Sequence, residues 1–385
     1  MTSKPPFDGE VVRLGELVES SKAKNKDGLF ADVYSVTNSH GFVPSQEYFN
    51  KEVYSKELRT YRVVHRNMIS YNPSRINVGS VAVQDKVDNA IVSPLYVVFS
   101  ADETKVIPGY LVRFLRSKPG LDQIAQQSIG TVRSNLKFDA LCKMQMPLPS
   151  LQAQVERMNK LTLVEQLADD CENYLSHLDE LVKSRFVEMF GGSSLATRTI
   201  GELATDIRYG TSKKSSDEGR YTYLRMNNMT DDGRLDFADT KRITLDGSEL
   251  DKCLVHKGDL LFNRTNSREK VGKTAVFEED EPMVIAGYII RVRLVPDIRS
   301  RYLCAYMNLP HVKEQLRAMA KGAVHQANIN AKQLGSIQVP VPRISQQDEF
   351  ISFVSRVDKL RVEAQAQKEK LQTLYDSLAQ DYFAI

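Results

Sequence analysis

Two polar, basic loops hold the side chains with the clearest capacity for chemistry. They are Tyr209-Gly210-Thr211-Ser212-Lys213-Lys214 and Asn263-Arg264-Thr265-Asn266-Ser267-Arg268, and both contain few residues that could pack a core. Arg suits guanine, Asn and Gln suit adenine, Ser and Thr suit several bases, and Lys and Arg also neutralise phosphates. These loops therefore offer non-covalent recognition of a nucleic acid. A solvated turn without any partner has a similar composition and is the alternative.

Several segments resemble catalytic or cofactor-binding motifs, but each lacks a residue that its motif requires. Gly272-Lys273-Thr274 looks like the end of a phosphate-binding loop, but Ser267 stands where that pattern needs a glycine. Tyr71-Asn72-Pro73-Ser74 lacks the second proline and the aromatic residue of an adenine methyltransferase motif. The six histidines form no close ligand pair, and the four cysteines have no zinc or disulfide spacing. We therefore expect a non-catalytic chain that binds no metal and no cofactor.

The elements that would position the loops occur twice in the sequence. Leu14-Gly15-Glu16-Leu17 returns as Ile200-Gly201-Glu202-Leu203, and Met146-Pro147-Leu148-Pro149 returns as Val339-Pro340-Val341-Pro342. This period of about 193 residues far exceeds the roughly 20–50 residues of a solenoid repeat. The pattern predicts an internal duplication of a whole domain plus a helix. Its two diverged heads would read related but different targets.

Each repeat begins with a strand-rich part. Residues 89–99 and 283–292 are rich in β-branched and aromatic side chains, which predicts strands. Helical patterns follow at 109–128 and 300–320. We expect globular target-recognition domains at 1–148 and 193–341, each followed by the segment that positions it.

After each Pro-x-Pro sequence come about 40 residues with almost no glycine or proline, and apolar residues recur in steps of seven. This spacing predicts two long spacer helices, 149–192 and 342–385. The predicted fold class is α+β, with two similar domains joined by two antiparallel coiled-coil helices in a pseudo-twofold arrangement. Alternatively, each helix docks on a separate partner or on its own domain. The predicted seam residues are Val164, Leu167, Cys171, Tyr174, Leu178, Leu181, Val357, Leu360, Ala364, Leu371, Leu374 and Leu378.

The composition indicates which partners and which cellular compartment suit the chain. Its 385 residues are 26% charged and 42% hydrophobic, as in an ordinary globular protein, and the net charge is only +3. A nucleic-acid binder with this balance must gather its basic residues into patches. No apolar run approaches the roughly 18 residues of a membrane span, and the N-terminal residues lack the apolar core of a signal sequence. We therefore expect a cytoplasmic protein without a membrane partner.

A combination of short motifs resembles the DNA-specificity subunits of type I restriction-modification systems, over residues 11–190 and 198–385. Gly-Glu-Leu stands near the start of each half, and Lys257-Gly258-Asp259 forms a characteristic turn. Gln326-Ala327-Asn328-Ile329-Asn330 precedes the second Pro-x-Pro, and Gln346-Gln347-Asp348-Glu349-Phe350-Ile351 opens the second long helix. The first half departs from this pattern, with Arg66-Asn67-Met68 and Thr131–Leu136 at the corresponding places. Such divergence implies that the two heads recognise different half-sites.

The resemblance implies a subunit that catalyses nothing itself. Its two domains would read the two parts of a bipartite, asymmetric site in double-stranded DNA, and the helices would set the number of unread base pairs between them. Two methyltransferase (modification) subunits, and restriction subunits in a full phage-defence complex, would be its partners. The holoenzyme would be an adenine-specific DNA methyltransferase and an ATP-dependent endonuclease. S-adenosylmethionine, ATP and Mg would be bound by those partners, not by this chain.

Candidate DNA contacts come from both halves, and they combine polar or basic chemistry with a loop position. We expect them at Lys22, Lys24, Lys26, Asn72, Ser74, Arg75, Arg133, Ser134, Tyr209, Thr211, Ser212, Lys213, Lys214, Asn263, Arg264, Thr265, Arg268, His325, Gln326 and Asn328. The alternative function is a non-catalytic coiled-coil scaffold that binds protein partners through its duplicated heads. Scaffolds favour exposed aromatic and leucine anchors, whereas these loops offer Arg, Lys, Asn, Ser and Thr.

Overall fold

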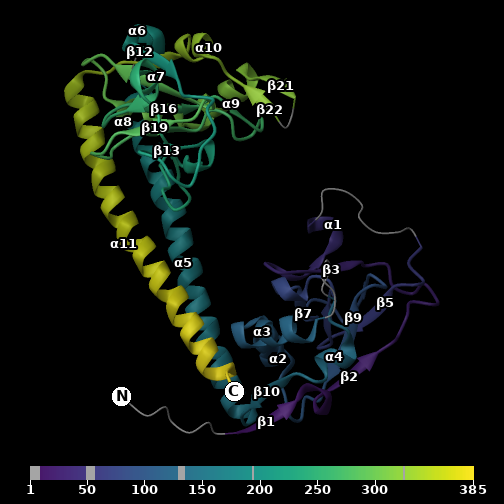
Figure 1. Ribbon diagram of the computed structural model, residues 1–385. Coiled ribbons are helices and arrows are strands. Elements are labelled where there is room, and N and C mark those ends of the chain that lie inside the picture. The colour runs from purple at the N-terminus through teal and green to yellow at the C-terminus, as the bar shows by residue number, and fades with distance from the viewer. Residues whose placement is uncertain (1–8, 49–56, 129–134, 193–194, 324–325) are drawn as a thin grey trace, which may run out of the picture. The chain divides into compact units, whose positions relative to one another are not determined.

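The computed structural model describes residues 9–48, 57–128, 135–192, 195–323 and 326–385 of the chain. It divides into two compact units (Figure 1). Unit 1 comprises Met1–Glu172 and Ala366–Ile385, and unit 2 comprises Asn173–Gln365. Both units contain helices and sheets, so the mixed α+β class predicted from the sequence is confirmed.

An antiparallel sheet of order β2-β9-β6-β7 is the framework of unit 1. Its side chains Tyr71 and Phe99 share a core with Tyr110 and Phe114 of a covering helix, all four at 0% exposure. Unit 1 also contains three two-stranded sheets, which are β1-β10, β3-β4 and β5-β8. The strands of unit 1 are β1 (Glu10–Arg13), β2 (Val18–Ser21), β3 (Tyr34–Thr37), β4 (Gly41–Pro44), β5 (Arg62–His65), β6 (Ile69–Tyr71), β7 (Val81–Val83), β8 (Asn89–Val92), β9 (Val97–Ala101) and β10 (Gln145–Leu148).

The helical region predicted at 109–128 consists of two helices rather than one. The first ends at Arg116 and the next begins at Lys118. Pro119 lies in the first turn of the second helix, where its missing N–H and its ring prevent continuation from the turn before. The helices of unit 1 are α1 (Ser45–Tyr48), α2 (Pro108–Arg116), α3 (Lys118–Gln127), α4 (Phe138–Leu141) and the 3-10 turns Leu14–Glu16 and Ile76–Val78.

Unit 2 contains two four-stranded sheets and one three-stranded sheet. The orders are β12-β20-β16-β18, β14-β13-β19-β15 and β17-β22-β21, and only the β13-β19 pair is parallel among the described pairs. A separate pair joins β11 and β23. The strands are β11 (Thr197–Thr199), β12 (Ala204–Tyr209), β13 (Tyr221–Leu224), β14 (Lys241–Ile243), β15 (Leu254–Val255), β16 (Leu260–Asn263), β17 (Thr265–Asn266), β18 (Thr274–Val276), β19 (Met283–Ile285), β20 (Ile289–Leu294), β21 (Lys321–Ala323), β22 (Gln326–Asn328) and β23 (Gln338–Pro340).

The segment predicted to be helical at 300–320 is also broken by a proline. One helix ends at Met307 and the next begins at Pro310, which occupies a position where a missing N–H costs nothing. The helices of unit 2 are α6 (Ile200–Leu203), α7 (Gly247–Cys253), α8 (Ser300–Met307), α9 (Pro310–Met319), α10 (Ala331–Gly335) and the 3-10 turn Met226–Asn228.

Two helices of 40 residues, α5 (Leu151–Phe190) and α11 (Ile344–Phe383), occupy the ranges predicted for long helices. In unit 1, Phe383 of α11 packs against Tyr110, with 5.1 Å between ring centroids. In unit 2, Phe186 of α5 packs against Phe350 of α11, with a centroid distance of 5.3 Å. Both helices therefore contribute to the cores of the units. Among the described residues, no helix has the length and apolar character needed to cross a membrane.

Candidate nucleic-acid interface

Arg264 lies at the joint between β16 and β17, where the backbone is held on both sides. Its N–H donates to the Tyr288 carbonyl at 2.9 Å, and its carbonyl accepts from the Ile329 N–H at 2.9 Å. The preceding residue, Asn263, is fully buried and donates through Nδ2 to the carbonyls of Thr265 and Tyr288, each at 3.3 Å. Asn263 is among the predicted DNA contacts, and its buried amide also shapes the turn that carries Arg264.

Tyr209, Arg264 and Asn328, which we call the Arg264 cluster, come from three separate segments and meet in unit 2. The Arg264 Cζ lies 4.9 Å from the centroid of the Tyr209 ring, and its Nη2 donates to Asn328 Oδ1 at 3.0 Å. The Tyr209 hydroxyl accepts from the Ala331 N–H at 2.8 Å. Ring and amide thus fix the guanidinium in one place before any ligand arrives. An arginine held in this way loses little side-chain entropy when it binds.

Strand pairing explains why these residues converge. β17 pairs with β22, which sets Thr265 opposite Asn328. Tyr209 ends β12, whose partner strand β20 also pairs with β16, the strand that leads into Arg264. Thr265, which is also a predicted contact, is only 7% exposed. Gln326 and Arg268 are exposed near this sheet, and His325 lies outside the described residues.

The second predicted loop, Thr211–Lys214, is fixed at its beginning. Gly210 is required there, because an added Cβ would meet the Ile285 carbonyl oxygen at 2.2 Å. The Tyr223 hydroxyl donates to the carbonyls of Thr211 at 3.0 Å and Lys213 at 3.1 Å. Ser212 and Lys214 are exposed, and so is Lys213. The loop therefore presents two lysines and a serine from a rigid base.

Glu249 is a member of this surface that the sequence did not reveal. It stands on α7, and its carboxylate accepts from Thr211 Oγ1 at 2.8 Å and pairs with Lys213 Nζ at 2.6 Å. The hydrogen bond from Lys213, followed by that from Thr211, lowers the pKa of Glu249 below its ordinary value. It therefore stays ionised and partly neutralises the loop. Thr211 and Glu249 are 38 positions apart, and the sequence between them has no pattern that would have predicted the contact.

A buried ion pair supports the strand that ends in Tyr209. Arg291, 1% exposed, donates from Nη2 to Asp206 Oδ2 at 2.6 Å, and its Nη1 reaches the Asp251 and Leu254 carbonyls at the end of α7. Burial raises the pKa of Asp206, but hydrogen bonds from Arg208 and Arg291 outweigh this effect and hold it below its ordinary value. Arg291 thus ties α7, which carries Glu249, to β12.

In unit 1 the predicted lysines lie on a loop organised by a buried asparagine. Asn25 is 2% exposed, its Nδ2 donates to the Phe30 carbonyl at 2.8 Å, and its Oδ1 accepts from the Phe30 N–H at 3.1 Å. The lysines that flank it, Lys22, Lys24 and Lys26, are all exposed. The hydrogen bonds of Asn25 therefore fix a loop that exposes three lysines to solvent.

The other predicted contacts of unit 1 form a turn. Asn72 Oδ1 accepts from the Ser74 N–H at 3.1 Å and from Ser74 Oγ at 2.9 Å, and the Arg75 N–H donates to the Asn72 carbonyl at 3.0 Å. Ser74 and Arg75 are exposed, whereas Asn72 is half-buried. Arg133 and Ser134 lie outside the described residues. The lysine loop and this turn are not joined by any contact among the described residues comparable to the Arg264 cluster.

The predicted helix seam separates into buried and exposed positions. Exposure is 3–7% at Val164, Leu178, Val357, Ala364 and Leu371, and Cys171 and Leu378 are half-buried. The other line of each helix is 43–46% exposed, at Leu167, Tyr174, Leu181, Leu360 and Leu374. Each long helix therefore buries one apolar line and leaves the second open to solvent.

No group of three or more His, Cys, Asp or Glu side chains in the described part of the chain has the arrangement of a metal site. The described cysteines are free, and burial raises the pKa of the Cys304 thiol to about 12, so this thiol is unreactive near neutral pH. The arginine, asparagine and lysine side chains of the Arg264 cluster and the Thr211–Lys214 loop have the chemistry of base-edge and phosphate contacts.

The comparisons with known proteins agree with this chemistry. Residues 193–373 match the type I restriction modification DNA specificity domain. The chain is 22% identical over 66% of its length to the EcoKI specificity subunit of Escherichia coli K12, and 27% identical over 42% to a putative MjaX specificity subunit of Methanocaldococcus jannaschii. It is 22% identical over 73% to the StySPI specificity subunit of Salmonella potsdam. The matches span 59%, 39% and 65% of those relatives.

Solved structures share the fold. A chain from a type I R-M system studied for its complex assembly and conformational transition has a TM-score of 0.64 at 16% identity, with 100% of both chains covered. The type I restriction-modification S subunit of M. genitalium has a TM-score of 0.52 at 14% identity, with 100% of this chain and 98% of that one covered. The chain is therefore similar in sequence and fold to type I restriction-modification specificity subunits, and residues 193–373 match their DNA specificity domain.

Proposed function

We propose that unit 2 binds double-stranded DNA sequence-specifically and that Arg264 reads a base edge. The observation that carries this proposal is the Arg264 cluster, which lies within the matched specificity domain. The ring of Tyr209 and the amide of Asn328 hold the guanidinium, and arginine is the side chain that most often reads guanine through O6 and N7. Lys213 and Lys214 would neutralise phosphates beside it.

We infer further that unit 1 reads a second, different sequence, so that the target is bipartite and asymmetric. Two parallels support an internal duplication. The order β2-β9-β6-β7 in unit 1 corresponds to β12-β20-β16-β18 in unit 2, and the β1-β10 pair corresponds to β11-β23. The polar loops differ between the units, with the lysine loop around Asn25 in one and the Arg264 cluster in the other. Equivalent frameworks with different loops are what two half-sites require.

The two long helices would pair antiparallel and set the number of unread base pairs. Contacts between them support this pairing: Lys368 pairs with Glu172 in unit 1, and Arg361 pairs with Asp179 in unit 2. Arg185 Nη2 also lies 3.4 Å from Glu349 Oε1. The exposed apolar line of each helix would then be available for two methyltransferase subunits, with restriction subunits added in the full complex. The partners, not this chain, would bind S-adenosylmethionine, ATP and Mg.

The proposal is tested by co-expressing the chain with its cognate methyltransferase subunit and mapping N6-methyladenine in the host genome. We expect methylation at one split motif, two short elements separated by a fixed gap. With the Arg264→Ala variant, methylation should fall or spread to sites that differ at one position of one element. The matched comparison is Arg268→Ala, an exposed arginine in the same loop outside the cluster. We also expect Arg268 to contact DNA, but its loss should lower methylation without changing the motif.

The scaffold alternative predicts the opposite result. A soluble complex with an active methyltransferase whose methylation pattern is independent of this chain would favour a protein that only assembles partners. Methylation lost equally at all sites in both arginine variants would show that Arg264 contributes charge alone and reads no base.

A further inference from the structure

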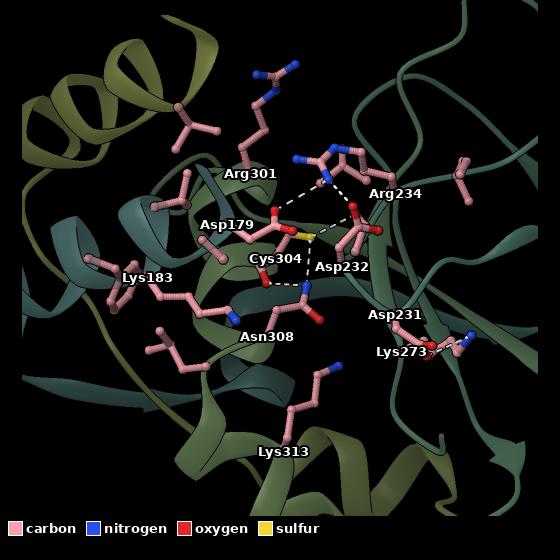
Figure 2. A pocket seen from close by; sticks show the side chains of 18 of the residues that line it. Asp179, Lys183, Asp231, Asp232, Arg234, Lys273, Arg301, Cys304, Asn308 and Lys313 are labelled. Atoms are coloured by element: carbon pink, nitrogen blue, oxygen red, sulfur yellow. Dashed lines mark hydrogen bonds and ion pairs between the residues drawn. The ribbon is translucent and has the colours of Figure 1, made fainter. Parts of the chain in front are cut away.

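A cavity of about 990 Å³ lies wholly within unit 2 and outside the Arg264 cluster. Its walls come from α5, α8, α9 and α11 and from two segments, 231–237 and 269–279 (Figure 2). This volume is within the range of pockets that hold small ligands. Apolar side chains form part of the wall, among them Val182, Phe186, Val276 and Leu309.

One end of the cavity is closed by ion pairs that satisfy one another. Arg234 pairs with Asp232 and, at 3.5 Å, with Asp358 Oδ1. Arg301 pairs with Glu278 at 2.5 Å and with Asp358 at 3.4 Å. Because each charge at this end already has a partner of opposite sign, a ligand gains little there.

The other end is formed by three lysines, of which Lys183 pairs with Glu180 at 2.7 Å and Lys313 is the least compensated. Lys313 Nζ donates to the Gly272 carbonyl at 2.8 Å, and within the described residues no carboxylate lies within ion-pair distance of it. Lys273, with 12% of its side chain exposed, contacts Asp231 at 2.9 Å, while Asp231 itself is largely exposed. Figure 2 shows the ammonium groups of Lys183 and Lys313 extending toward Asn308 from different sides.

Two features of this end would favour a ligand that carries both a negative charge and a hydrogen-bond donor. Burial lowers the pKa of Lys313 to about 8, Cys304 and Asp231 oppose this effect, and Arg317 and Lys273 add smaller reductions. An anion beside this ammonium would relieve that penalty. Asn308 Oδ1 is buried and has no hydrogen-bond partner among the described residues, whereas its Nδ2 donates to the Thr274 and Cys304 carbonyls. A buried acceptor of this kind favours a donor from a ligand.

We propose that this cavity binds a small organic phosphate of about mononucleotide size. The phosphate would lie beside Lys313 and Lys273, and Lys183 would reach it only by leaving Glu180. A hydroxyl or amino group would donate to Asn308 Oδ1, and a ring would pack on the apolar wall. A phosphate is favoured over a carboxylate because its additional acceptor oxygen suits several ammonium groups at once. The site belongs to this chain and does not depend on the proposed reading of DNA.

Isothermal titration calorimetry of the full chain with adenosine 5′-monophosphate tests the proposal. This probe combines a phosphate, donor groups and a flat ring. We expect saturable binding, with adenosine and inorganic phosphate each about tenfold weaker or worse, because each lacks one half of the contacts. Lys313→Met should weaken binding of adenosine 5′-monophosphate by about tenfold or more, because it removes the central charge.

Lys332→Met is the matched control, since Lys332 is exposed on α10 and does not line the cavity. If Lys313→Met fails to fold, as judged by its thermal unfolding, Lys273→Met replaces it and should also weaken binding. Equal binding of adenosine 5′-monophosphate and adenosine would overturn the proposal. So would equal binding of inorganic phosphate, unchanged affinity in a folded lysine variant, or no heat of binding at millimolar probe.

Discussion

Gln154 and Gln347 make matching sets of three hydrogen bonds in the two units. Gln154 Nε2 donates to the Pro149 carbonyl at 3.0 Å and the Lys105 carbonyl at 2.9 Å, and its Oε1 accepts from the Ile107 N–H at 2.9 Å. Gln347 repeats this with the Pro342 and Asp297 carbonyls at 2.9 and 3.1 Å and the Arg299 N–H at 2.8 Å. Both glutamines are 0% exposed and stand in the first turns of the long helices. Each one therefore fastens a globular part to the start of its helix.

Replacing Gln347 by leucine should loosen this joint in unit 2. Buried backbone groups left without partners cost about 1–3 kcal/mol each, so local opening becomes more frequent. Hydrogen exchange should accelerate at the amides around Arg299, while peptides of unit 1 stay unchanged. Gln152→Leu, an exposed glutamine on α5, is the control. Unchanged protection near Arg299 would mean that the joint does not depend on this side chain.

The Arg264 cluster predicts a graded series in DNA binding. Arg264→Ala should weaken binding to the cognate site by about 1–3 kcal/mol and leave random DNA almost unaffected. Tyr209→Leu should weaken it less, and Tyr209→Phe least, because phenylalanine keeps the ring and loses only the hydroxyl that accepts from Ala331. Fluorescence anisotropy with labelled cognate and random duplexes measures the affinity of each variant for the two kinds of DNA. Equal losses on the two duplexes would identify Arg264 as a phosphate contact.

Glu249 should restrain binding to DNA in general. Glu249→Gln removes the carboxylate that pairs with Lys213 and frees that lysine for a phosphate. Affinity for random duplex DNA should rise at low salt, and the slope of log affinity against log salt should steepen by about 0.9. A slope identical to that of the unmodified chain would show that Lys213 does not reach the backbone. Asp217→Asn, which frees Lys241 instead, is a control at a neighbouring exposed pair.

The Asp206–Arg291 pair predicts how unit 2 responds to acid. The pKa of Asp206 is lower in the folded than in the unfolded chain, so its contribution is fully present above the unfolded value of about 3.9 and is lost as pH falls through the folded value. Asp206→Asn should destabilise unit 2 near neutral pH by about 3–5 kcal/mol, because Arg291 is left buried without its partner. Thermal unfolding at several pH values should show this difference shrinking below about pH 4. A difference independent of pH would contradict the assignment.

The exposed line of the long helices predicts where partners attach. Leu181 is 46% exposed, whereas Leu178 is 3% exposed only one turn away. Leu181→Glu should leave thermal unfolding of the chain unchanged and reduce co-purification with the methyltransferase subunit. Leu178→Glu should destabilise the chain itself, because a charge would replace a buried leucine. Full retention of the partner by the Leu181 variant would place the docking surface elsewhere.

The sequence could predict features that depend on residues close together in the chain, such as the long helices. Seven-residue spacing predicted both long helices, yet it could not tell which apolar line is buried, since Leu178 and Leu181 fit the repeat equally well. Asn263 and Arg264 are neighbours of similar polarity, and only the strand pairing around them shows that Asn263 is fully buried in the turn whereas Arg264 is half-buried. The contact between Arg264 and Asn328 spans 64 residues, and that of Thr211 with Glu249 spans 38. Such long-range pairs leave no mark in composition or periodicity.

The pairing of β1 with β10, and of β11 with β23, has a consequence for how chains of this kind can change. Glu10 lies opposite Leu148, and Thr197 lies opposite Pro340, so each globular part starts and finishes on adjacent strands. A foreign cassette whose two ends share this pairing can replace the part between them without altering the helix that follows. Under the proposed function, two genetic crossovers at these strands would give the descendant a new DNA target.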